Sequence, residues 1–128
     1  MRWLLVLLVA CGGDKPGPMP PKRANTDLIL GEFERKPPDG TTAIRFRADG
    51  SVTVAHDKDK LDGETLATGT FDLDKDQLKL TYAKGMCAGG GAGIYQVVIS
   101  KVGIHFKKVD DSCAQRAKMD GQTWWRIK

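Results

Sequence analysis

Short segments in which apolar and polar residues alternate recur from about residue 27 to the end of the chain, and this alternation most constrains the fold. Successive side chains of a β-strand point to opposite faces, so a period of two predicts strands with one buried face. The segments lie at about residues 28–33, 44–47, 52–54, 65–73, 78–82, 94–101, 104–107 and 123–127. About eight short strands joined by turns predict an all-β domain, either a sandwich or a closed barrel.

Turn residues and apolar positions give the expected connections and core. Asp49-Gly50 is typical of a two-residue hairpin loop between two of the segments. The apolar side chains at alternating positions should face the interior of the domain. This expected interior set is Ile44, Phe46, Val52, Val54, Phe71, Leu78, Leu80, Val98, Ile104 and Phe106.

Residues 110–121 break the alternation and predict one short helix near the C-terminus. Asp111 or Ser112 is a suitable N-cap, good helix formers follow, and Gly121 is suited to the end of a helix. We expect two to three helical turns. A helix in this place would close one end of a barrel.

The chain begins with a segment typical of export rather than of a folded domain. Arg2 precedes the apolar run Leu4 to Val9, which is followed by the small residue Ala10 and by Cys11. This run is shorter than the roughly 20 apolar residues that a membrane-spanning helix needs. A charged start, a short apolar run and a small residue at the cut site predict a cleaved signal peptide over residues 1–10. Leu8-Val9-Ala10-Cys11 resembles the lipobox of bacterial lipoproteins.

The lipobox resemblance implies a lipid anchor on Cys11, and two or more acyl chains hold a protein stably at a membrane. Cleavage of the signal without lipidation is the alternative. Residues 11–26 are rich in Gly and Pro and predict an extended tether. In Gram-negative lipoproteins an Asp after the cysteine favours the inner membrane, whereas Gly12 stands here and favours the outer membrane. The expected domain, residues 27–128, would then be held in the cell envelope.

Two cysteines remain once Cys11 is assigned to the lipid, namely Cys87 and Cys113. In an exported protein an even remainder predicts a disulfide, and two free thiols are the alternative. A zinc site is disfavoured because only His56 and His105 could add ligands, without the paired spacing of zinc motifs. Both histidines are expected at the surface or at the rim of the barrel.

The distribution of charge argues against nucleic acid as a partner. The formal net charge is +4, and acidic and basic residues are interleaved, as in Asp57-Lys58-Asp59-Lys60. Interleaved charges produce a solvated surface rather than a basic stripe.

Two local motifs resemble ligand sites but lack required residues. The glycine-rich stretch 85–93 lacks the Gly-Lys-Ser/Thr of a phosphate loop and leads into a strand instead of a helix. Asp72-x-Asp74-x-Asp76 resembles the start of a calcium loop, but the sixth position is not Gly and the twelfth is not Glu. No Ser or Cys has an evident pairing with a His and a carboxylate that would activate it as a nucleophile. We therefore expect no catalytic residue, no metal and no cofactor.

Leu30-Gly31-Glu32-Phe33 resembles the Gly-x-Trp motif on the first strand of lipocalins and fatty-acid-binding proteins, with Phe in place of Trp. The resemblance covers roughly residues 27–128 and implies a small antiparallel up-and-down barrel. In that family a basic residue covers the aromatic ring at one end of the barrel. Arg126, on the last strand beside Trp124, or Arg116, on the helix, would take this role over Phe33.

A second string resembles exported lipocalin-like proteins of bacteria. It reads Asp111-x-Cys113-x-x-Arg116 and is preceded by Cys87 and Gly93-x-Tyr95. Together the resemblances predict a membrane-anchored lipoprotein with a non-enzymatic barrel that binds a small apolar ligand.

The alternative is a structural or protein-interaction module of the cell envelope, such as an inhibitor. Trp124 and Trp125 bear on this alternative because adjacent residues of a strand face opposite sides. One indole should fill the core, and the other should be exposed or lie under Arg116. An exposed Trp can mark a surface that binds a partner.

Overall fold

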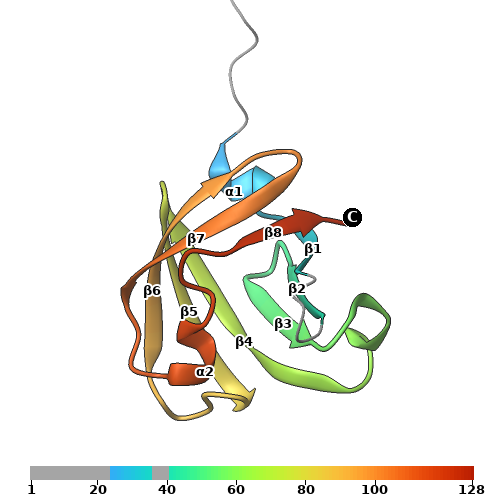
Figure 1. The fold of residues 1–128 in the computed structure, drawn as a ribbon, viewed down its shortest axis with the longest axis vertical. Helices are drawn as coiled ribbons and strands as arrows, with labels where there is room; N and C mark the ends of the chain where they lie inside the picture. The colour runs from blue at the N-terminus through green and yellow to red at the C-terminus, as the bar shows by residue number, and fades with distance from the viewer. Residues whose placement is uncertain (1–23, 36–40) are drawn as a thin grey trace, which may run out of the picture.

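The computed structural model describes residues 24–35 and 41–128, which form a closed β-barrel (Figure 1). Within these residues, eight antiparallel strands pair in sequence order, and β1 closes the barrel against β8. The strands are β1 (Gly31–Arg35), β2 (Thr42–Phe46), β3 (Ser51–Ala55), β4 (Thr65–Asp74), β5 (Gln77–Gly85), β6 (Ala92–Ile99), β7 (Gly103–Asp110) and β8 (Thr123–Arg126). The helical elements are α1 (Asn25–Leu28), the 3-10 turn η2 (Lys58–Lys60) and α2 (Ala114–Ala117). The predicted all-β barrel of eight strands with a short helix near the C-terminus is confirmed.

Irregular strand pairings bend the sheet as it closes. Register shifts lie in the β3–β4, β4–β5 and β6–β7 pairs, and such bulges increase the local twist of a strand. The shift in β4 comes between Thr68 and Gly69. A Cβ atom at Gly69 would lie 2.7 Å from the Cα atom of Tyr82 on β5, so glycine allows the two backbones to approach closely here.

The core lies inside the barrel and consists of the inward side chains of all eight described strands. Eight of the ten expected interior residues are buried, and Phe71 is half-buried and packed against them. Phe46 makes edge-to-face contacts with Phe33 and Phe71, and Phe106 makes them with Tyr95 and Trp124. These aromatic rings fill much of the barrel interior with side chains.

The prediction that Val98 faces the interior is wrong, because 67% of its surface is exposed. β6 instead buries Tyr95, Val97 and Ile99. Val97 pairs with Phe106 and Ile99 with Ile104, and these β7 residues face inward. Three successive apolar residues, 97–99, fit either register by composition alone, and the partner strand decides between them.

The first expected strand begins later than predicted. Asn25 to Leu28 form α1, so Asn25 and Thr26 do not belong to the tether and Leu28 does not belong to a strand. α1 covers one end of the barrel, where Leu28 and Ile29 are buried (Figure 1). The Asn25 side chain donates a hydrogen bond to the carbonyl of Lys75 in the β4–β5 turn. β1 begins only at Gly31, whose φ of +133° a residue with a side chain rarely adopts.

Two turns differ from their sequence predictions in detail. The β2–β3 hairpin is confirmed, but its turn spans Arg47 to Gly50 rather than two residues. Gly50 donates its N–H to the carbonyl of Arg47 and has a φ of +87°, which favours glycine. α2 has a single turn rather than two to three, and its N-cap is Cys113 rather than Asp111 or Ser112. After α2 the chain turns, with the N–H of Gln122 donating to the Met119 carbonyl, and the Met119 side chain is buried in the core.

Candidate functional site

A pocket of about 420 Å³ opens at the end of the barrel where α2 lies. The ends of several strands form its wall, and α2 with the residues that follow it forms one side. Apolar side chains in this wall are Val54, Leu66, Met86, Met119 and Trp124. Polar or charged ones include Arg35, His56, Tyr82, Arg116 and Lys118. The size and the mixture of apolar walls with a few polar groups are typical of small-molecule sites.

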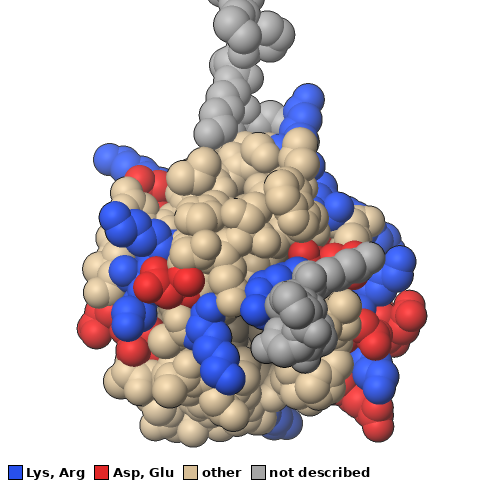
Figure 2. Space-filling model, in the orientation of Figure 1, with Lys and Arg blue, Asp and Glu red and all other residues tan. Residues whose placement is uncertain are grey.

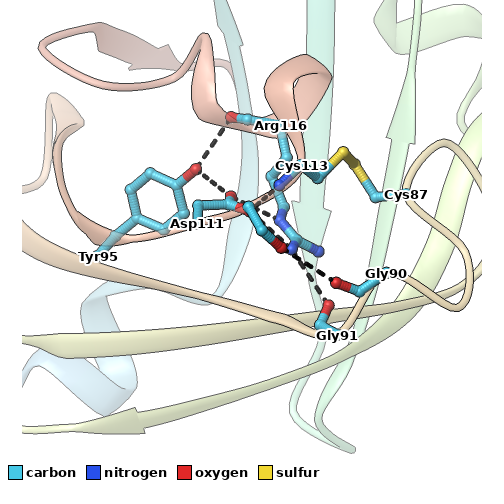
Figure 3. Close-up of a disulfide and its surroundings, with 8 residues drawn as sticks. Cys87, Gly90, Gly91, Tyr95, Asp111, Cys113 and Arg116 are labelled. Carbon is cyan, nitrogen blue, oxygen red and sulfur yellow. Dashed lines mark hydrogen bonds and ion pairs between the residues drawn. A yellow bond between two sulfur atoms is a disulfide. The ribbon is translucent and has the colours of Figure 1, made fainter.

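Arg116, which lines this pocket, belongs to a fully buried ion pair. Arg116 Nε lies 2.7 Å from Asp111 Oδ2, Arg116 Nη2 lies 2.9 Å from Asp111 Oδ1, and neither side chain is exposed (Figure 3). The Tyr95 hydroxyl donates a hydrogen bond to Asp111 Oδ2, and the backbone N–H of Cys113 donates to Asp111 Oδ1. Both carboxylate oxygens therefore have two donors each, which is how a buried carboxylate can stay charged.

A disulfide between Cys87 and Cys113 holds the segment before α2 against the β5–β6 loop, and the predicted pairing is confirmed (Figure 3). On the same loop, the Gly91 carbonyl accepts a hydrogen bond from Arg116 Nη2. Gly93, where β6 passes the ion pair, leaves room for it: a Cβ atom there would lie 2.7 Å from Arg116 Nε. The glycine-rich stretch thus supports the ion pair and carries half of the disulfide.

Burial and hydrogen bonding fix the protonation states in this cluster. Burial opposes the charged form of Asp111, but the hydrogen bonds from Arg116 and Tyr95 outweigh it and hold the pKa of this carboxyl below its ordinary value of 3.8. Burial, reinforced by the hydrogen bond to Asp111, raises the pKa of the Tyr95 hydroxyl above its ordinary value. Burial likewise raises the pKa of the Tyr82 hydroxyl. Both tyrosines are therefore protonated donors at neutral pH.

Two buried donors of the cluster have no hydrogen-bond partner among residues 24–35 and 41–128: Arg116 Nη1 and the Tyr82 hydroxyl. Arg116 Cζ lies 5.0 Å from the centroid of the Tyr82 ring, so the two groups are neighbours in the pocket wall. Buried donors without partners are uncommon in folded proteins and call for a specific explanation.

The residues expected to close a barrel end lie at two different ends. Arg126 lies over Phe33, with 4.6 Å between Cζ and the ring centroid, whereas Arg116 lies over Tyr82. Arg126 also donates to the carbonyls of Leu30, Leu28, Ser100 and Lys101 and so ties α1 to the β6–β7 turn. Trp124 is buried and lines the pocket, and Trp125 on the opposite face is 55% exposed.

The other candidate residues do not converge on a reaction centre. His56 is exposed at the pocket rim, and His105 lies on β7 with Nδ1 2.8 Å from Thr123 Oγ1. In the parts of the chain that the structure describes, no three His, Cys, Asp or Glu residues group closely enough to hold a metal ion.

Sequence reasoning missed the pocket role of Tyr82 and the pairing of Asp111 with Arg116. The string Asp111-x-Cys113-x-x-Arg116 stood out by resemblance, and Tyr95 with it. Its residues meet where the disulfide and the turn of α2 hold the segment against Tyr95 of β6. Tyr82 carried no signal beyond its place on an alternating strand.

Comparisons with known proteins give no family for the chain. No protein-family model matches it, and no significant match was found among curated proteins. Among the described helices, none is both long and apolar enough to cross a membrane.

Proposed function

We propose that the chain is a membrane-anchored, exported lipoprotein whose barrel binds a small ligand with an apolar body and catalyses no reaction. The pocket at the α2 end carries this proposal. Its volume of about 420 Å³ lies in the range of about 300–1,000 Å³ that is usual for small-molecule sites. The resemblance of Gly31-Glu32-Phe33 to the lipocalin motif, with Arg126 over Phe33, also supports it.

The ligand would lie at the end of the barrel rather than through its centre. Phe46 and Phe106 are buried inside the barrel and pack edge to face against Phe71 and Tyr95, so aromatic rings occupy space that a long ligand would need. Val54, Met119 and Trp124 face the pocket with apolar surface. A compact apolar body of moderate length therefore fits better than a long acyl chain.

Native mass spectrometry of the protein purified from its own host tests this function. We expect a population heavier than the polypeptide and its anchor by a few hundred daltons, which gentle activation converts to the unbound mass. A single species at the mass of polypeptide plus anchor, in every preparation, would contradict ligand binding.

The anchor has its own test, because Cys11 lies outside the described residues. Cys11→Ser removes the thiol that forms the lipid bond, and two buried acyl chains are what make such anchoring stable. We expect the variant to move from the membrane fraction to the soluble fraction, while the wild type stays with membranes after a high-salt wash. An unchanged membrane association of the variant would refute lipid anchoring through Cys11.

The second candidate function is protein interaction, and an exposed apolar face favours it. Val98, Val102 and Trp125 are each more than half exposed, on β6, the β6–β7 turn and β8. Figure 2 shows a broad uncharged area over β7 and β8, with acidic and basic side chains interspersed around it. Two results together would support this function instead. The wild type would form crosslinks to an envelope protein that Trp125→Ser does not form, and the purified barrel would carry no small ligand.

A further inference from the structure

We infer that the pocket takes an organic anion, whose charged oxygen group binds between Arg116 Nη1 and the Tyr82 hydroxyl. This inference rests on the proposed ligand-binding function and adds the chemical class of the ligand. Both side chains line the pocket, and 0% of Arg116 and 2% of Tyr82 is exposed. The guanidinium is a donor only, and the Tyr82 hydroxyl carries one O–H donor. A ligand atom that accepts hydrogen bonds can therefore satisfy both groups.

The hydrogen bonds of Arg116 show which edge of its guanidinium remains for a ligand. Nε and Nη2 bind the two oxygens of Asp111, and Nη2 also reaches the Gly91 carbonyl. Nη1 has no such partner in the described parts of the chain. The ion pair thus holds the guanidinium rigidly and leaves Nη1 for an acceptor, an arrangement that lowers the entropy cost of binding.

The second donor belongs to a side chain that packs against Arg116. The Tyr82 ring packs under the guanidinium, with 5.0 Å between its centroid and Arg116 Cζ. Its hydroxyl also lacks a partner among the described residues. An oxygen of a carboxylate or sulfonate that accepts from both groups would satisfy two buried donors at once, which a purely apolar ligand cannot do.

The charges around the pocket favour a negative ligand. Asp111 neutralises Arg116, while Lys118 adds positive charge to the lining. No Asp or Glu occurs among the described residues that line the pocket. The remaining wall is apolar, so the ligand class is a small organic anion with a hydrophobic skeleton.

A matched pair of dyes tests the inference. 8-Anilinonaphthalene-1-sulfonate carries a sulfonate that N-phenyl-1-naphthylamine lacks, and the two molecules are otherwise the same. The assay uses the full chain with Cys11→Ser, so that lipid and detergent do not bind the dyes. We expect the sulfonate dye to bind at least about tenfold more tightly than the neutral dye, because hydrogen bonds to charged groups are the strong ones.

Tyr82→Phe separates a specific hydrogen bond from general attraction to a basic protein. It removes a hydroxyl that bonds to no described residue and keeps the ring and every charge. We expect a loss of affinity of about tenfold for the sulfonate dye and less than about twofold for the neutral dye. Unfolding by urea should begin at the same or a higher concentration than in the wild type. Trp125→Phe, on the far exposed face, is the control and should change neither affinity.

The other outcomes overturn defined parts of the account. Equal affinities for the two dyes, unchanged by Tyr82→Phe, would contradict the anion subsite and leave the ligand pocket intact. Binding that is lost in Trp125→Phe but kept in Tyr82→Phe would place the dye on the outer face and contradict the subsite. Binding of neither dye would overturn the ligand pocket, and the anion subsite with it.

Discussion

Asp111→Asn should lower the free energy of unfolding by about 3–5 kcal/mol at pH 7, the usual cost of breaking a buried ion pair from one side. The substitution keeps the shape of the side chain but leaves the Arg116 guanidinium charged and fully buried. It also weakens the hydrogen bonds from Tyr95 and from the Cys113 backbone. Urea unfolding followed by Trp fluorescence measures the change.

Asp110→Asn is the matched control, because the Asp110 carboxyl is exposed. This substitution should change the free energy of unfolding by less than about 0.5 kcal/mol.

The pH dependence of stability gives a second arm of the same experiment. The pKa of Asp111 is lower in the folded chain, so its contribution is present above the ordinary carboxyl pKa of 3.8 and is lost as the pH falls through the folded value. The wild type should therefore lose stability more steeply than Asp111→Asn below about pH 4. A loss below about 1 kcal/mol at pH 7 would show that the pair does not stabilise the fold.

Removal of the disulfide should lower the free energy of unfolding by about 3–4 kcal/mol, because the bond closes a loop between residues 26 apart. The double variant Cys87→Ala/Cys113→Ala avoids a free thiol, and thermal unfolding against the oxidised wild type measures the loss. Reduced wild type is the control and should melt with the double variant. Equal melting of oxidised and reduced wild type would contradict a stabilising bond.

Alternation of apolar and polar residues was sufficient to predict the barrel. Successive side chains of a strand point to opposite faces, so a strand with one buried face needs an apolar residue at every second position. It failed where composition did not distinguish two registers, as at Val97, Val98 and Ile99, since the pairing with β7 decides which residue is inside. It also failed at α1. Leu28 and Ile29 are buried because they cover one end of the barrel, and neither of them lies on a strand.

The candidate site was predictable only in part. Cys87 and Cys113 were found by counting, and Arg126 over Phe33 by resemblance. The pocket was not predictable, because Tyr82 and Arg116 are 34 positions apart (116 − 82 = 34) and meet only through the closed sheet and the disulfide. A buried donor without a partner, such as Arg116 Nη1, cannot be recognised from the sequence, because its surroundings exist only in the folded chain.

The central claim is that a ligand anion binds at the α2 end of the barrel, and NMR of arginine side chains tests it most directly. Arg116 and Arg126 each have an Nε–H in a hydrogen bond, the first to Asp111 and the second to the Lys101 carbonyl at the opposite end. On addition of 8-anilinonaphthalene-1-sulfonate, we predict that the Nε–H signal of Arg116 shifts and that of Arg126 does not. Saturable binding of the dye that leaves the Arg116 signal unmoved, or moves that of Arg126 instead, would contradict the account.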